Sequence, residues 1–195
     1  GGMGYYDYDI ENCHYVLLNQ LNKMYGGDTL TYVKKYINDT EAFRNKIGSE
    51  LGLSVGLSKK ILLMIVYGGG LTVRHRYDKE TGGNKDSAII TDLKIFYDDD
   101  NKLVDEAFDN IQNNKTIMGI YNDVKSARDL ILADKDFYVT YRGDEYFKNH
   151  INRRTLLYNG REKKSKGSLL SHMLQGIESY ILDIAYEEDN NIVMW

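Results

Sequence analysis

Apolar residues recur along most of this chain at the three- to four-residue spacing that places them on one face of a helix. Near the ends of these stretches stand Asn, Asp and Ser, which favour N-caps, and Gly, which favours C-termini. The pattern predicts helices from Asn12 to about Met24, from Asp28 for a short stretch, over Glu41–Leu51 between Asp39-Thr40 and Gly52, and over Lys59–Tyr67 between Ser58 and Gly68-Gly69-Gly70. Further helices are predicted over Asn101–Asn113, Thr116–Ala133 and Ser168–Tyr186.

Runs of β-forming residues between the helices predict strands. The predicted strands cover Tyr5–Ile10, Ala88–Tyr97, Asp136–Arg142 and Asn191–Trp195, and charged loops are expected over Val73–Arg76 and Asp78–Lys85. In the last helix, the residues expected in the core are Leu174, Ile177, Ile181 and Ile184. Together the elements predict an α+β fold that is predominantly helical.

The composition is that of a folded protein rather than a disordered tail: of 195 residues, 42% are hydrophobic and 28% are charged. The net charge of −4 provides no global basic field, so any nucleic-acid contact must come from local clusters of Lys and Arg. The single cysteine, Cys13, excludes an internal disulfide and a cysteine-based zinc cluster. No apolar run reaches membrane-spanning length, so we expect a soluble cytoplasmic protein, of a bacterium or a virus-infected cell.

The first candidate site is the acidic end of the strand predicted at Tyr5–Ile10. Asp9 stands at this strand-to-helix junction, followed by Ile10 and, five residues after Asp9, by His14. Carboxylate oxygen is what the hard cation Mg²⁺ requires. The ordinary alternative is that Asp7 and Asp9 are solvated acids and that His14 has a local partner in its helix.

The second candidate site lies on the apolar helix at Lys59–Tyr67. Lys59 precedes the pair Tyr67-Gly68 by eight residues, with Leu63 midway. Eight residues are about two helical turns, so Lys59, Leu63 and Tyr67 are expected on one face. The alternative is an ordinary buried helix with a lysine at its N-terminus and a glycine after its C-terminus.

The third candidate site combines Gln175-Gly176 with a basic stretch upstream. A glycine in mid-helix costs about 1 kcal/mol relative to alanine, so we expect a close approach or a bend at Gly176. The densest basic cluster of the chain comprises Arg153, Arg154, Arg161, Lys163, Lys164 and Lys166, with Tyr158 interleaved. Such a cluster suits the phosphates of a nucleic acid, and a charged solvated loop is the alternative.

In order and spacing, Asp9, Lys59 with Tyr67-Gly68, and Gln175-Gly176 resemble the motifs of family A nucleic-acid polymerases. This family includes the DNA polymerase I-like enzymes and the single-subunit RNA polymerases of phages and mitochondria. The resemblance spans nearly the whole chain and implies nucleotidyl transfer with two Mg²⁺ ions. It also implies a palm, made of an antiparallel sheet with packed helices, and helical fingers: palm with motif A over residues 1–27, a fingers-like region with motif B over 28–135, and palm with the Gln-Gly helix over 136–195.

The resemblance assigns roles to individual residues. Asp9 would bind the Mg²⁺ ions with help from the carbonyl oxygen of Ile10. Lys59 would neutralise the incoming nucleoside triphosphate, and Tyr67 would support the new base pair. Gln175 would donate to minor-groove acceptors that every base pair of the primer–template presents. The further expected contacts are His14, Lys60 and Gly68 to the nucleotide, and Arg153, Arg154, Arg161, Lys164 and Lys166 to nucleic acid.

Three positions depart from the family pattern. His14 stands where the DNA polymerases usually carry a ribose-excluding glutamate, and Leu63 where they tend to carry an aromatic residue, so both permit ribonucleotides. Val55 stands where motif B usually has an arginine, which leaves another cation to contact phosphate; the candidates are Lys60, Arg74 and Arg76.

The compact spacing of 50 residues between Asp9 and Lys59, together with Gln175-Gly176, favours a DNA-directed DNA polymerase with a DNA template, a primer and nucleoside triphosphates as partners. A single-subunit-type RNA polymerase is the alternative. Family B polymerases fit less well: Lys60 would match their lysine, but Met64 replaces their expected asparagine.

The chain stops after the apolar stretch Asn191–Trp195, where the His-Asp pair of motif C is expected. We therefore expect either a fragment or a site completed by a second polypeptide. A non-catalytic polymerase-like module that binds nucleic acid or a partner chain is a competing hypothesis. An unrelated α+β protein is another, and it predicts that Asp9, Lys59 and Gln175 do not line one cleft.

Overall fold

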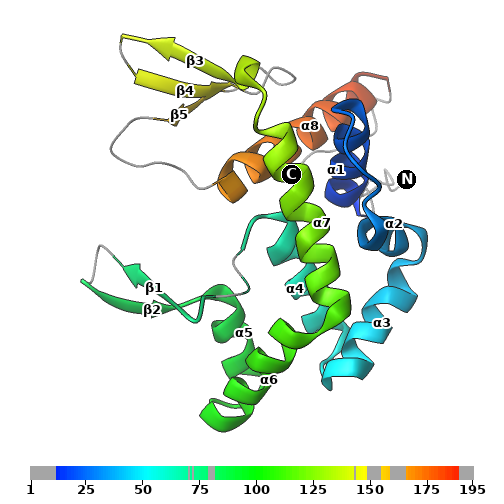
Figure 1. Cartoon of the computed structure of the whole chain (residues 1–195), viewed down its shortest axis with the longest axis vertical. Coiled ribbons are helices and arrows are strands. Elements are labelled where there is room, and N and C mark those ends of the chain that lie inside the picture. Colours follow the sequence, from blue (N-terminus) through cyan, green and yellow to red (C-terminus); the bar gives the residue numbers. More distant parts are fainter. Residues whose placement is uncertain are drawn as a thin grey trace, which may run out of the picture.

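The structure is a computed structural model that describes residues 12–69, 71, 73–78, 82–142, 144–148, 155–158 and 166–188. These residues form a predominantly helical α+β fold, as predicted, and contain two small antiparallel sheets (Figure 1). The helices are α1 Cys13–Met24, α2 Thr31–Asn38, α3 Thr40–Leu51, α4 Val55–Val66, α5 Ala88–Phe96, α6 Asn101–Asn113, α7 Lys115–Ile131 and α8 Lys166–Glu188, with a short 3-10 helix at Lys135–Phe137.

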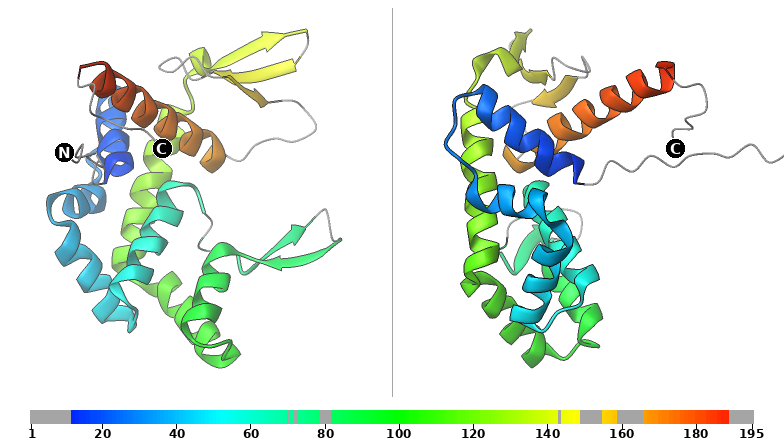
Figure 2. Two further views of the ribbon diagram at one scale, coloured as in Figure 1. Left: turned by 180° about the vertical axis from the view of Figure 1, so that it is seen from behind. Right: turned by 90° about the vertical axis from the view of Figure 1, so that its right-hand side faces the viewer.

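Helix α7 is the central element of the fold (Figure 1). It contacts α1, α2, α4, α6 and α8. The other two views show α1 and α8 together at one end of α7, with α3, α5 and α6 toward the other end (Figure 2). The core joins them through fully buried side chains, among them Leu18 of α1, Ile61 of α4, Ile120 of α7 and Leu174 of α8.

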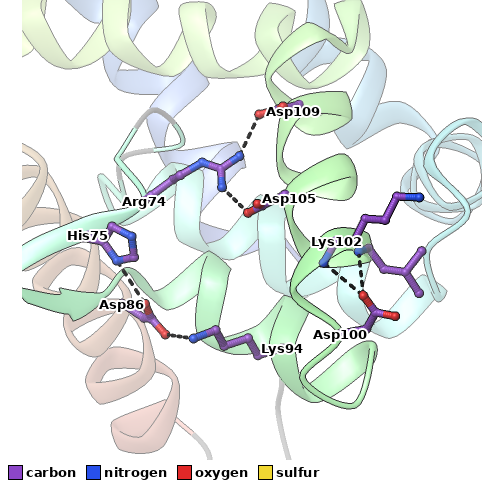
Figure 3. Close-up of polar contacts among 9 residues, drawn as sticks. Arg74, His75, Asp86, Lys94, Asp100, Lys102, Asp105 and Asp109 are labelled. Atoms are coloured by element: carbon purple, nitrogen blue, oxygen red, sulfur yellow. Dashed lines mark hydrogen bonds and ion pairs between the residues drawn. The ribbon is translucent and has the colours of Figure 1, made fainter.

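Side chains next to the helix starts explain why several boundaries were predictable. The Asp39 carboxylate accepts a hydrogen bond from the backbone N–H of Ala42 at 3.0 Å, and Gly52 ends α3 with a φ of 65°. The Asp100 carboxylate accepts from two backbone N–H groups of the first turn of α6 (Figure 3). Helices α3, α6 and α7 therefore begin within a residue of their predicted starts.

Helix α4 begins one turn before the predicted start, at Val55. Its N-cap is Ser54, whose hydroxyl accepts from the backbone N–H of Leu57 at 3.1 Å. The predicted cap, Ser58, lies inside the helix, and its hydroxyl donates to the Ser54 carbonyl oxygen at 3.1 Å. Both serines suit a cap locally, and burial of Leu57 and Ser58 favours the earlier one.

Helix α2 begins at Thr31, so the predicted start at Asp28 is wrong. The carboxylate that caps α2 comes from another helix: Asp123 of α7 accepts from the backbone N–H groups of Tyr32 and Val33 at 2.6 and 3.1 Å. Because Asp123 is distant from α2 in the sequence, the residues next to the start of α2 do not indicate this cap.

The strands form two separate sheets. Strands β1 His75–Asp78 and β2 Gly83–Asp86 make a hairpin with His75 opposite Asp86, in a region predicted to be charged loop. Strands β3 Tyr138–Tyr141, β4 Asp144–Lys148 and β5 Thr155–Tyr158 form an antiparallel sheet in that order. Strand β3 lies within the predicted strand Asp136–Arg142.

The predicted strand at Ala88–Tyr97 is wrong, because these residues form helix α5. Its β-branched residues favour a strand locally, but Ile89 and Leu93, four residues apart, are both buried. Packing of a helical face against the core outweighs the local preference.

Two of the four residues expected in the core on α8 are exposed. Leu174 and Ile177 are buried, whereas Ile181 and Ile184 are 38% and 41% exposed. The reason is that the C-terminal half of α8 extends beyond the other helices (Figure 2). The predicted strands Tyr5–Ile10 and Asn191–Trp195 lie outside the described residues. Among the helices that the structure describes, none combines the length and apolar character needed to cross a membrane.

Candidate functional site

A pocket of about 290 Å³ is lined by residues of five helices and their flanking positions. It contains four of the residues that the sequence singled out: His14, Lys59, Leu63 and Tyr67. The full lining comprises Asn12, Cys13, His14, Tyr15, Tyr36, Arg44, Lys59, Leu63, Tyr67 and Glu178. The pocket therefore draws on segments from α1 near the N-terminus to α8 near the C-terminus.

Helix α4 supplies one wall of the pocket. Lys59, Leu63 and Tyr67 follow one another at four-residue steps, and all three line the pocket, as their spacing predicts. The remaining faces of α4 include the buried residues Ile61 and Ile65. Burial of these side chains fixes the rotation of α4 and so directs Lys59 toward the pocket.

His14 is the centre of a polar chain across the pocket. Its Nδ1 lies 3.1 Å from the Tyr67 hydroxyl and its Nε2 lies 3.2 Å from the Glu178 carboxylate. The His14 and Tyr67 rings also meet edge to face, with centroids 5.0 Å apart. The Nε2 atom is buried and lies within ion-pair distance of Glu178 without the geometry of a hydrogen bond, and the tautomer of His14 decides which partner donates in its contact with Tyr67. The chain joins α1, α4 and α8.

Burial favours the neutral forms of this polar chain. It lowers the pKa of His14 below 6.5, an effect that exceeds the opposing attraction of the Glu178 carboxylate. Burial also raises the pKa of Tyr67, and the charge of Glu178 raises it further, while a hydrogen bond with Gln175 acts in the opposite direction. At neutral pH the pocket thus presents a neutral imidazole and a protonated phenol.

The pocket also contains two cations, Arg44 and Lys59. Neither forms an ion pair with a residue that the structure describes. The cations expected to contact phosphate are placed differently: Lys60 pairs with Asp92 at 2.9 Å, and Arg74 pairs with two acids of α6 (Figure 3). Neither Lys60 nor Arg74 lines the pocket. The side chain of the third candidate, Arg76, lies outside the described part of the chain.

Gly68 follows Tyr67 and meets α8. It has a φ of 76°, and a Cβ there would lie 2.1 Å from the Cα of Gly167. The two glycines therefore let the end of α4 and the start of α8 approach backbone to backbone. This contact places α8 beside Tyr67, and Gly68 itself is not among the lining residues.

Helix α8 carries the other predicted contact residues that the structure describes. Gln175 is exposed, and its side chain lies close enough to the Tyr67 phenol to lower the pKa of that phenol. Lys166 stands at the first residue of α8, away from the pocket lining, and pairs with Asp129 of α7 at 3.1 Å. The predicted residues that lie outside the described part of the chain are Asp9, Ile10, Arg153, Arg154, Arg161 and Lys164.

Two lining residues, Arg44 and Glu178, were not predicted from the sequence. Each is a single charged residue on a helix, and no motif marks Arg44. Glu178 follows Gln175 by three residues, so helical spacing places both on one face, and this is the signal that could have identified it.

The arrangement combines two cations that lack carboxylate partners in the described structure with neutral hydrogen-bonding groups. Such a pocket suits an anionic ligand that also carries hydroxyl or amide groups. No protein-family model, curated protein or solved structure matches this chain. Its function must therefore be inferred from the pocket itself.

Proposed function

We propose that the chain is a polymerase-like nucleotidyltransferase core whose pocket binds the incoming nucleoside triphosphate, with DNA-directed DNA synthesis favoured. The observation that carries the proposal is the pocket. His14 belongs to the segment that resembles motif A, and Lys59 and Tyr67 to the one that resembles motif B, and all three line it. Gln175 of the Gln-Gly helix does not line the pocket, but it acts on the lining residue Tyr67. Of the three residues whose common cleft would set the chain apart from an unrelated protein, Lys59 lines the pocket, Gln175 does not, and Asp9 lies outside the described residues.

The placement of the helices supports a division into palm and fingers. Helices α1 and α8, from the two segments proposed as palm, lie in contact at one end of the molecule (Figure 2). Helices α3, α5 and α6, from the region proposed as fingers, lie toward the other end. Helix α4, which carries Lys59, lies between them and contacts α7.

Each pocket residue has a task in this proposal. Lys59 attracts the triphosphate, because its ammonium group has no described partner. Tyr67 and His14 face the sugar and base as neutral hydrogen-bonding groups. Gln175, exposed beside Tyr67, is available to the minor groove of the primer–template. The partners are a DNA template, a primer and nucleoside triphosphates, and the proposed location is the cytoplasm.

Mg²⁺ is part of the proposal through residues that lie just before α1. Mg²⁺ takes oxygen ligands, and Glu178, the carboxylate among the described lining residues, faces His14 instead. Among the described residues, no group of three or more His, Cys, Asp or Glu gathers to hold a metal. The described residues alone therefore do not fit a Mg²⁺ site, and the proposal depends on Asp9 and Ile10.

A single-subunit-type RNA polymerase is the second candidate. Leu63 and His14 both line the pocket, at positions where the resemblance leads one to expect an aromatic residue and a ribose-excluding glutamate in DNA polymerases. The hydroxyl of Tyr67 is hydrogen-bonded to His14, at the position where the resemblance to DNA polymerases leads one to expect a glutamate. A pocket of this kind tolerates a ribose 2′-hydroxyl.

Primer extension with the complete site, made of this chain together with the segment or second polypeptide expected to supply motif C, tests the proposal. A primed DNA template is incubated with Mg²⁺ and either deoxynucleotides or ribonucleotides. We expect template-directed addition of deoxynucleotides, lost in Asp9→Ala and reduced roughly 10- to 100-fold in Lys59→Ala, since a hydrogen bond to a charged group contributes about 1.5–3 kcal/mol. Lys46→Ala is the matched control, because Lys46 lies on α3 outside the pocket lining and pairs with Glu50.

The other outcomes separate the alternatives. Addition of ribonucleotides only would favour the RNA polymerase. Binding of primed template without extension would favour a non-catalytic module. If the chain binds neither nucleotide nor primed template, the proposal is wrong.

A further inference from the structure

The guanidinium of Arg44 is held in place by neutral groups. Its Nε and Nη2 donate to the Tyr36 hydroxyl at 3.1 and 2.8 Å, and its Nη2 also donates to Oδ1 of Asn12 at 3.0 Å. Tyr36 is itself fixed by edge-to-face contacts with Tyr15 and Phe43. Asn12, Tyr36 and Arg44 all line the pocket. The orientation of Arg44 is therefore set by hydrogen bonds to two side chains, Asn12 before α1 and Tyr36 of α2.

No carboxylate of the described structure neutralises Arg44. Two other arginines differ in this respect: Arg74 pairs with Asp105 and Asp109, and Arg128 pairs with Asp129. A partly buried cation that is hydrogen-bonded only to neutral acceptors keeps most of its positive potential. It also keeps both N–H groups of Nη1 without a described partner, in the planar fork that suits phosphate oxygens.

We infer that Arg44 binds phosphate in this pocket and that, together with Lys59, it receives the polyphosphate tail of the ligand. This inference rests on the proposed function, which it deepens by assigning a phosphate contact that motif B of the chain lacks at Val55. Arg44 reaches the pocket from α3, whereas Lys59 reaches it from α4. A ligand tail bound by both is held between two helices.

The size of the pocket agrees with this assignment. Its volume of about 290 Å³ lies just below the range of ligand sites, which span roughly 300–1,000 Å³. Such a pocket accommodates the phosphate tail and leaves the nucleoside toward Leu63 and Tyr67. Tyr36 acts here as a positioning residue. Its hydroxyl holds the Arg44 guanidinium in place, and it contributes no charge of its own to ligand binding.

Isothermal titration of the chain with inorganic tripolyphosphate tests the inference, with a nucleoside triphosphate as the second ligand. Arg44→Gln should weaken tripolyphosphate binding about 10- to 100-fold, because a charge-assisted contact is lost. Lys46→Gln, two residues further along the same helix and outside the lining, should leave the affinity unchanged. Binding by the natural chain should also weaken as salt is added.

Two further variants keep the test decisive if Arg44→Gln folds poorly. Arg44→Lys retains the charge but loses the planar fork, so its affinity should fall between the natural chain and Arg44→Gln. Tyr36→Phe removes the hydroxyl that holds the guanidinium, and it should weaken tripolyphosphate binding less than Arg44→Gln does. Unchanged affinity in Arg44→Gln, with or without a loss of thermal stability, would refute the inference and indicate a structural role for Arg44.

The same titrations distinguish failure of the inference from failure of the proposed function. If tripolyphosphate binds in an Arg44-dependent way but primed template is not extended, the phosphate site stands and polymerase activity does not. If extension occurs and Arg44→Gln leaves both extension and tripolyphosphate binding intact, the proposed function stands and the role of Arg44 is wrong. If tripolyphosphate does not bind the natural chain, the inference fails whatever the extension assay shows.

Discussion

Gly68→Ala perturbs the contact between the end of α4 and the start of α8. Gly68 has a φ of 76°, and a Cβ there would lie 2.1 Å from Gly167 Cα, so one backbone must move. The left-handed conformation costs a non-glycine residue about 1–2 kcal/mol. Overpacking typically adds about 1–3 kcal/mol. We therefore expect the free energy of unfolding to fall by about 2–5 kcal/mol.

Gly52→Ala is the matched control for the backbone term. Gly52 ends α3 with a φ of 65°, and a Cβ there would have no heavy atom within 4 Å. Gly52→Ala should therefore lower the free energy of unfolding only by the cost of the left-handed conformation, about 1–2 kcal/mol. Urea unfolding followed by circular dichroism measures both variants, and their difference isolates the contact with Gly167. Equal losses in Gly68→Ala and Gly52→Ala would show that α4 and α8 do not approach as the structure describes.

Two other contacts lead to predictions that can be measured in the same way. Asp123 provides the only carboxylate cap on α2 among the described residues; Asp123→Asn weakens this cap and Asp123→Ala removes it. Asp123→Ala should therefore lower the free energy of unfolding, measured by urea titration, by about 0.5–2 kcal/mol. The pKa of His14 is lower in the folded chain than the ordinary 6.5, so the unfolded chain binds more protons below pH 6.5. The free energy of unfolding should consequently fall as the pH drops below about 6.5, and His14→Gln should reduce that fall; an unchanged pH dependence would contradict the assignment.

The sequence predicts those helices whose ends are set by neighbouring residues. Asp39 and Asp100 cap the helices that follow them directly, and the starts of α3 and α6 were predictable for that reason. The start of α2 depends on Asp123, which is distant in sequence. Helix α5 contains Ile89 and Ile90, whose β-branched side chains give a strand-like local pattern that packing overrides.

The same distinction applies to the candidate site. Lys59, Leu63 and Tyr67 lie on one helix, so their common face follows from helical geometry. The approach of His14 to Tyr67 and Glu178 depends on how α1, α4 and α8 pack, and helical periodicity contains no information on that packing. Arg44 was missed for the same reason, because its pocket neighbours belong to other helices.

Tyr67 offers a measure of how α8 is placed against the pocket. Gln175 and Glu178 stand one helical turn apart, so a shift of α8 moves both, yet they act on Tyr67 in opposite directions. The hydrogen bond with Gln175 lowers the Tyr67 pKa and the charge of Glu178 raises it. Gln175→Ala should therefore raise the Tyr67 pKa, and Glu178→Gln should lower it.

Nuclear magnetic resonance of tyrosine ring carbons resolves this titration, with Tyr67→Phe identifying the signal among the 17 tyrosines. Changes of the same sign in Gln175→Ala and Glu178→Gln would contradict the described arrangement. Because the Tyr67 pKa responds to α8 without any ligand, it separates two causes of lost nucleotide binding. For a substitution that does not touch Tyr67, such as Arg44→Gln, an unchanged Tyr67 pKa indicates a lost ligand contact, whereas a shifted pKa indicates that α8 has lost its alignment with α4.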